Sequence, residues 1–186
     1  MKNAATISLY EPGIVLFDPI QLSGYLKLFK PNLKDVFDFF INNEEAGKKA
    51  VTMGIVFPIY EVPEREYSIF IAHPANPITQ GATQVCHYSN LPIEITSGIL
   101  IAADLNALID WDEFFFTNYL ENYKKKLDNN DYLQVKPGRY RMDISGYTNL
   151  PKPLSNYGYE LKLTSTDTLP KISNYKDVSD FDFSMD

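Results

Sequence analysis

Four carboxylates lie close together in the stretch ADLNALIDWDEFF: Asp104, Asp110, Asp112 and Glu113. The Asp-x-Asp spacing of Asp110 and Asp112 offers oxygen ligands of the kind that hard cations prefer. Helix capping explains the same residues more simply, because a carboxylate accepts backbone N–H groups well at the first turn of a helix. Asp110, three residues before Glu113, fits a capping box. We therefore predict that these carboxylates begin a helix and are available to a partner, and we predict no metal site.

The histidines and the single cysteine offer little catalytic chemistry. His73 precedes Pro74 after an expected strand, and His87 follows Cys86 directly. Neighbouring residues on a strand face opposite sides, so Cys86 and His87 are not expected to form a nucleophile–base pair. We expect an inert, buried Cys86 and a surface His87. A zinc site needs about four ligands at suitable spacing, and the sequence shows no such set.

The common catalytic motifs are absent as well. The sequence has no phosphate-binding glycine loop of the P-loop or dinucleotide type, no nucleophile elbow and no zinc-protease helix. Arg139 and Arg141 form a short basic strip with Lys136, which is more often a solvated face than a phosphate site. The sequence therefore predicts no catalytic residue and no cofactor, and we do not expect an enzyme.

The charge balance limits the possible partners. The 186 residues include 24 Asp and Glu against 17 Lys and Arg, which gives a net charge of −7. Such a surface repels phosphate backbones, so nucleic-acid binding is not expected. It attracts a basic protein by raising the association rate, although the same charge also serves simple solubility. No apolar run approaches the roughly 20 residues that span a bilayer, and no export signal is recognisable, so we expect no membrane association and a cytoplasmic protein.

Apolar periodicity predicts the elements that position these side chains. Apolar residues repeat with helical spacing at 33–41 and at 112–127, where Phe116, Tyr119, Leu120, Tyr123 and Leu127 share one face. Asn32 is the expected cap of the first helix, and Gly47 is expected to stop the chain's helical path. Strands are expected within 5–29, 50–62, 67–73, 84–89, 91–104 and 157–164.

The stretch YLQVKPGRYRMDISGY (132–147) predicts a hairpin that turns at Pro137-Gly138 and buries Tyr140, Met142 and Ile144. The whole pattern predicts an α+β fold dominated by β structure, with antiparallel sheets in a sandwich or open barrel and two helices packed on one side. We expect one globular domain over 1–164 and a loose acidic tail over 165–186.

The C-terminal half resembles small bacterial inhibitors of the ComJ nuclease-inhibitor type and related toxin-immunity proteins. The resemblance lies in the strand residues Pro92, Ile93 and Ile95, followed by a short acidic segment. It continues in a second group of turn and strand residues, namely Val135, Pro137, Gly138, Tyr140 and Met142. It implies an antiparallel sheet protein that binds and blocks a toxic enzyme inside the producing cell, and it carries over no binding residue.

These observations lead to the hypothesis of an immunity-type inhibitor that neutralises a basic bacterial toxin, such as a nuclease, in the cytoplasm. The predicted partner-binding residues are Asp104, Asp110, Asp112, Glu113 and Glu121. One alternative is a small metal-assisted enzyme that uses Asp110, Asp112 and His87. The other is a structural component of a phage or secretion particle, where sheet-rich aromatic domains assemble.

Overall fold

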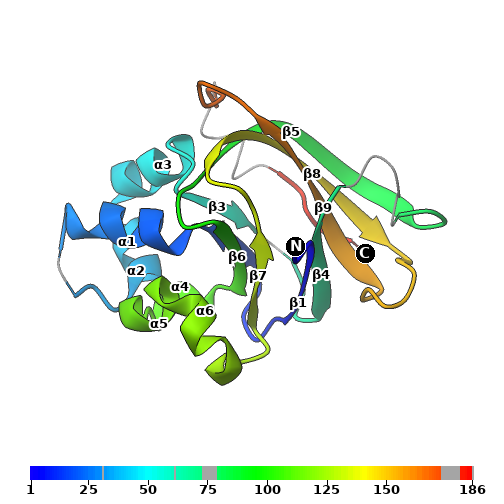
Figure 1. The fold of residues 1–186 in the computed structure, drawn as a ribbon, viewed down its shortest axis with the longest axis horizontal. Helices are drawn as coiled ribbons and strands as arrows, with labels where there is room; N and C mark the ends of the chain where they lie inside the picture. The colour runs from blue at the N-terminus through cyan, green and yellow to red at the C-terminus, as the bar shows by residue number, and fades with distance from the viewer. Residues whose placement is uncertain (31, 61, 73–78, 173–180, 186) are drawn as a thin grey trace.

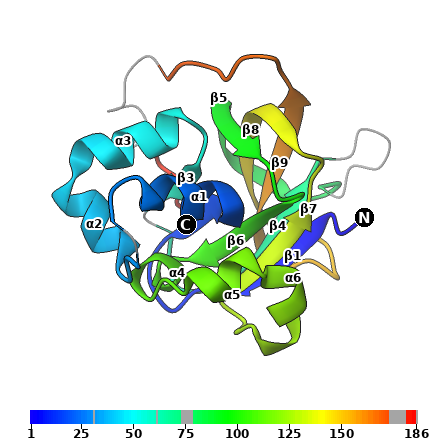
Figure 2. The ribbon, with the colours of Figure 1, turned by 60° about the vertical axis from the view of Figure 1, so that its left-hand side comes forward.

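A computed structural model describes residues 1–30, 32–60, 62–72, 79–172 and 181–185 of the protein. Two β-sheets and several short helices make up this structure, so the predicted α+β class with dominant β structure is confirmed. In Figures 1 and 2 the helices gather beside one sheet, and the other sheet lies on the far side of it. His73 lies outside the described residues. Within them, no helix combines the length and apolar character needed to cross a bilayer.

The first sheet lies next to the helices and has the strand order β3-β2-β6-β7, with every pairing antiparallel. Its strands are β2 (Ile14–Phe17), β3 (Val56–Ile59), β6 (Ile99–Asp104) and β7 (Asn130–Gln134). Every residue of β2, β3 and β6 is buried, because helices cover one face of this sheet and the second sheet covers the other.

The second sheet has five strands in the order β1-β4-β9-β8-β5. Their bounds are β1 (Ala4–Ser8), β4 (Glu66–Ile71), β5 (Thr83–Ile95), β8 (Gly138–Thr148) and β9 (Tyr157–Ser165). β4 and β9 run parallel, and all other pairs are antiparallel. β5 is one long strand with register shifts at Gln84/Cys86 and Tyr88/Leu91, where we had expected two separate strands.

The main core fills the space between the two sheets and continues under the helices. A smaller apolar cluster of Phe70, Leu150 and Leu154 lies apart from it. The backbone N–H of Gln134 donates to the carbonyl of Lys2 at 2.8 Å, so the edge strands β1 and β7 lie side by side. The two sheets therefore meet along one edge, and this contact protects both edges from pairing with other chains.

Helix α1 (Pro19–Lys27) corrects the expectation that residues 5–29 contain only strands and turns. Asp18 caps it by accepting the backbone N–H groups of Ile20 at 2.9 Å and Gln21 at 3.0 Å. Its second carboxylate oxygen accepts the N–H groups of Thr96 and Ser97, both at 2.7 Å, from the turn between β5 and β6. One buried carboxylate therefore fixes a helix start and a distant turn at once.

Helices α2 (Val36–Asn42) and α3 (Glu44–Thr52) follow one another almost directly. The predicted first helix begins three residues later than expected, because Asp35 rather than Asn32 is its cap and accepts the N–H of Asp38 at 2.8 Å. Gly47 does not stop the helical path. It lies inside α3, beside the Phe40 side chain of α2.

The helical region after β6 is divided into short pieces: α4 (Asn106–Ile109), α5 (Glu113–Thr117), α6 (Tyr119–Asn122) and the 3-10 turn η1 (Tyr123–Lys125). The predicted continuous helix breaks at Asn118, whose side-chain amide donates to the carbonyl of Phe114 at 2.9 Å and competes with the helical bonds. The break also rotates the expected apolar face, so that Leu120 and Leu127 are exposed.

The stretch 132–147 is not a hairpin. β7 pairs with β6 in the four-stranded sheet, whereas β8 pairs with β5 and β9 in the five-stranded sheet. The residues around Pro137 therefore carry the chain from one sheet to the other. The alternation predicted the buried face correctly for Met142 and Ile144, which are fully buried, and Tyr140 is half-buried. Periodicity fixes the face of a strand but not its neighbour.

The described C-terminal residues 181–185 pack against the five-stranded sheet. The Phe183 side chain is completely buried, and its carbonyl accepts the hydroxyl of Tyr159 at 2.7 Å. Phe181 stacks on Tyr88 with the ring centroids 4.2 Å apart. Met185 is buried too, and a Cβ at Gly146 would lie 3.1 Å from its Cε atom. The expectation of a loose tail does not hold for these residues.

Candidate functional site

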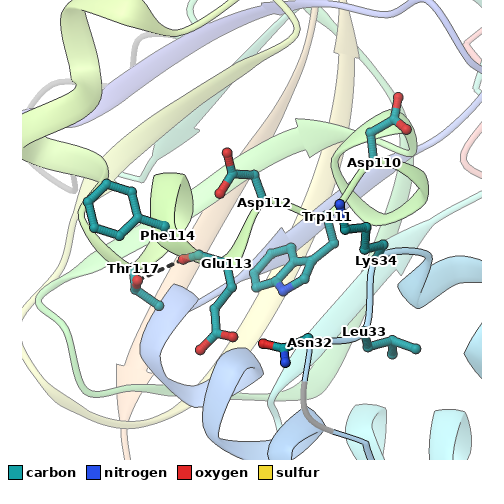
Figure 3. A pocket seen from close by; sticks show the side chains of 9 residues that line it. All are labelled: Asn32, Leu33, Lys34, Asp110, Trp111, Asp112, Glu113, Phe114 and Thr117. Atoms are coloured by element: carbon teal, nitrogen blue, oxygen red, sulfur yellow. Dashed lines mark hydrogen bonds between the residues drawn. The ribbon is translucent and has the colours of Figure 1, made fainter.

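A surface pocket of about 650 Å³ opens where the α4–α5 connection meets the loop before α2. Figure 3 shows its lining, to which Asp110, Asp112 and Glu113 contribute from the connection and from the start of α5. The opposite wall consists of residues 32–34. Three of the five predicted partner-binding residues therefore converge on one pocket.

Trp111 fixes this connection to the core. Its backbone N–H donates to the carbonyl of Lys34 at 2.8 Å, which ties the two walls of the pocket together. Its ring stacks on Phe116 with a centroid distance of 5.0 Å and an interplanar angle of 8°, and it meets Phe17 edge to face at 5.8 Å. Because the tryptophan between them is held in this way, Asp110 and Asp112 have a well-defined backbone position.

Asp112 is the residue that caps α5, and the predicted capping role of Asp110 is wrong. The Asp112 carboxylate accepts the N–H of Phe115 at 2.9 Å, and its carbonyl accepts the N–H of Phe116 at 3.0 Å. Asp110 instead ends α4. Both carboxylates are exposed, and in Figure 3 they lie on either side of Trp111.

Glu113 connects α5 to α1. Its carboxylate accepts the hydroxyl of Ser23 at 2.7 Å and forms an ion pair with Lys27 at 2.6 Å. The hydrogen bond from Lys27, followed by that from Ser23, lowers the pKa of Glu113. A negative charge is therefore maintained at the pocket wall, although it is already partly compensated within the chain.

Asp104 and Glu121 lie outside the pocket. Asp104 is completely buried at the end of β6, where it accepts the side-chain amide of Asn129 at 2.9 Å and the backbone N–H of Tyr10 at 3.2 Å. Burial raises the pKa of Asp104 in spite of these bonds. Its role is to join strands and loops, so it is unsuited to contact a partner. Glu121 is exposed on α6.

Exposed apolar groups accompany the acidic ones. Phe114 lines the pocket with 73% of its surface exposed, and Leu127 lines a second hollow of about 260 Å³. Asp110 and Asp112 line both hollows and so lie between them. Exposed apolar rings beside fixed charges are typical of protein-binding surfaces.

The structure does not bring together the residues of the metal-assisted alternative. His87 lies on β5 of the five-stranded sheet, with its Nδ1 atom 2.9 Å from the hydroxyl oxygen of Ser145, whereas Asp110 and Asp112 adjoin the helices. Within the described ranges, no group of three or more His, Cys, Asp and Glu side chains is arranged to hold a metal ion. Cys86 packs against the core and is half-buried, and burial raises its pKa.

No protein-family model and no curated protein matches this chain. Two solved structures are similar to it. One is ComJ from Bacillus subtilis, an inhibitor of the DNA-degrading activity of NucA, with 10% identity, a TM-score of 0.43 and coverage of 88% of this chain and 95% of ComJ. The other is the protein of crocagin biosynthetic gene J, with 16% identity, a TM-score of 0.45 and coverage of 87% and 97%. The predicted resemblance to ComJ is confirmed as a structural similarity at low sequence identity.

Proposed function

We propose that this chain is an immunity-type inhibitor that binds a basic toxic enzyme, such as a nuclease, and blocks it in the cytoplasm without catalysing a reaction itself. The observation that carries the proposal is the convergence of Asp110, Asp112 and Glu113 on one pocket beside the exposed Phe114 ring. This combination suits a protein partner, since charge speeds the encounter and a desolvated ring holds the complex.

The geometry of the pocket favours binding over simple solubility. Asp112 is fixed by capping α5, Glu113 is fixed by Ser23 and Lys27, and Trp111 anchors the backbone of both neighbours. Charges that serve only solubility need no fixed positions. Preorganised charges lose less side-chain entropy when a complex forms, so they contribute more to affinity. Exposed Glu121 on α6 remains a proposed contact with the partner, whereas the buried Asp104 does not take part.

The test begins with the protein encoded beside this chain's gene. Co-expression and co-purification establish a complex, and a nuclease assay measures inhibition. We then compare the triple variant Asp110→Lys, Asp112→Lys, Glu113→Lys with a control that reverses three exposed carboxylates elsewhere, Glu11→Lys, Glu64→Lys, Asp167→Lys. The overall change in charge is identical in the two variants.

We expect the pocket variant to weaken binding at least about 30-fold, because like charges placed against a basic partner are strongly unfavourable, and the control variant to change it only slightly. Circular dichroism checks that both variants fold. Equal losses in the two variants would show that only net charge matters, and an adjacent-gene product that is neither bound nor inhibited would contradict the proposed function.

A further inference from the structure

The indole N–H of Trp111 lacks an acceptor among the described residues. The side chain is 6% exposed, so it is more than nine-tenths buried. Every side-chain nitrogen and oxygen that is wholly shielded in the described part of the chain has a hydrogen-bond partner. The indole N–H is therefore open to the pocket, and in Figure 3 the ring nitrogen points toward the Asn32 side of it.

A donor that opens onto a pocket is available to a ligand, because no oxygen of the described residues accepts its hydrogen bond. The neutral indole binds a carbonyl oxygen well. The charged groups around it call for a cation, since the carboxylates of Asp110, Asp112 and Glu113 outnumber the ammonium group of Lys34 in the lining. The Glu113 carboxylate is already bound by Lys27 and Ser23, so a cation in the pocket would bind beside Asp110 and Asp112.

We infer that the pocket holds one arginine residue of the basic partner, an inference that rests on the proposed function. The main-chain carbonyl of this arginine accepts the indole N–H of Trp111, and its guanidinium group binds the carboxylate of Asp112, while Asp110 adds negative charge on the other side of Trp111 (Figure 3). Arginine fits better than lysine because its planar fork of N–H donors binds a carboxylate through two parallel hydrogen bonds. A pocket of about 650 Å³ has room for one such side chain and its adjoining peptide groups.

The single tryptophan of the chain gives a direct readout. In ¹⁵N-labelled full-length protein, one indole N–H cross-peak reports on Trp111. We titrate acetyl-arginine methylamide, which carries both recognition groups, and compare two probes that each lack one of them. Acetyl-norleucine methylamide keeps the carbonyl without the cation, and propylguanidinium keeps the cation without the carbonyl.

We expect the arginine compound to move the indole peak saturably. Propylguanidinium should move the backbone peaks of residues 110–112 but hardly the indole peak, and the norleucine compound should move neither. The double variant Asp110→Asn, Asp112→Asn should weaken arginine binding about fivefold, because the exposed ion pair with Asp112 and the nearby charge of Asp110 are both lost. Asparagine at position 112 still caps α5, so the variant keeps its fold. The control Glu64→Gln, at an exposed carboxylate away from the pocket lining, should leave binding unchanged.

Three results would overturn the inference. The indole peak stays in place with the arginine compound, it moves equally with the norleucine compound, or it responds equally in the double variant. If the peak stays in place while the triple charge reversal still abolishes partner binding, the arginine site is wrong and the proposed function stands. If arginine binds while the partner is indifferent to the triple reversal, the proposed function is wrong and the arginine site remains.

Discussion

Truncation of Phe183 to alanine tests whether the C-terminal segment is part of the fold. The ring is completely buried, and it meets Tyr88 and Tyr159 with centroid distances of 4.9 Å and 6.0 Å. Removing it loses the transfer free energy of the ring and leaves a cavity between aromatic neighbours that are themselves held by hydrogen bonds. Substitutions of this kind lower the free energy of unfolding by about 3–5 kcal/mol. In a chain of 186 residues, the loss lowers the melting temperature by about 6–20 °C.

The assay is equilibrium unfolding in urea, followed by far-UV circular dichroism. We expect a lower midpoint with an unchanged m-value, because the native surface stays the same. Phe181→Ala should cost less than half as much, since that ring is only half-buried, and exposed Lys171→Ala should change stability by less than about 0.5 kcal/mol. A loss below about 1 kcal/mol for Phe183→Ala would show that the segment detaches readily and that the packing argument is wrong.

Substitutions at three further positions test the contacts that hold the chain around the site. Asp18→Ala should lower the free energy of unfolding, measured by urea titration, by about 3 kcal/mol. The cause is that the N–H groups of α1 and of residues 96–97 lose their shared acceptor. A loss under about 1 kcal/mol would contradict this role. Asp112→Ala should cost about 1 kcal/mol and Asp112→Asn much less by thermal denaturation, and equal losses would show that the cap is unimportant. Glu113 has a lowered pKa, so its ion pair stabilises the fold above the ordinary glutamate pKa and this contribution is lost as the pH falls through the lowered value. The free energies of unfolding of the wild type and of Glu113→Gln should therefore differ at pH 7 by less than about 1 kcal/mol, and they should become equal in acid. A difference that grows in acid would contradict the predicted pH dependence.

The sequence predicted which strand faces are buried more reliably than which strands are neighbours. Met142 and Ile144 alternate toward the core as expected, because side-chain alternation is a local property of the backbone. The partner of β8 is not local. It depends on β9 and on the far end of β5, and the Pro-Gly pair at 137–138 looks the same in a hairpin and in a crossing between sheets.

Two helical regions were predicted from the sequence, at 33–41 and 112–127, but their limits were not predicted correctly. Asp35 and Asp112 carry the caps that were assigned to Asn32 and Asp110, and each lies within three residues of the prediction. α1 was missed because its apolar residues on both faces resemble a strand pattern. The Asp18 carboxylate that caps this helix is buried because it also accepts hydrogen bonds from residues 96–97, which are distant in the sequence. A tertiary contact of this kind leaves no local signal.

The candidate site was partly predictable. Three carboxylates in a short stretch pointed to it, and they do converge on the pocket. Asp104 follows a run of apolar residues in β6, which was a sign that it would be buried. The alternation of Phe181, Phe183 and Met185 was a comparable sign of packing, but the acidic residues around it concealed the pattern.

The position of β4 between β1 and β9 has a consequence for how the protein is made. Residues 66–71 are synthesised well before their parallel neighbour at 157–165. At ordinary translation rates of about 5–20 residues per second, one edge of β4 waits for roughly 4–18 seconds without its final neighbour. The growing chain exposes an open strand edge throughout that interval, so nascent molecules on crowded polysomes are more prone to aggregate than the folded protein.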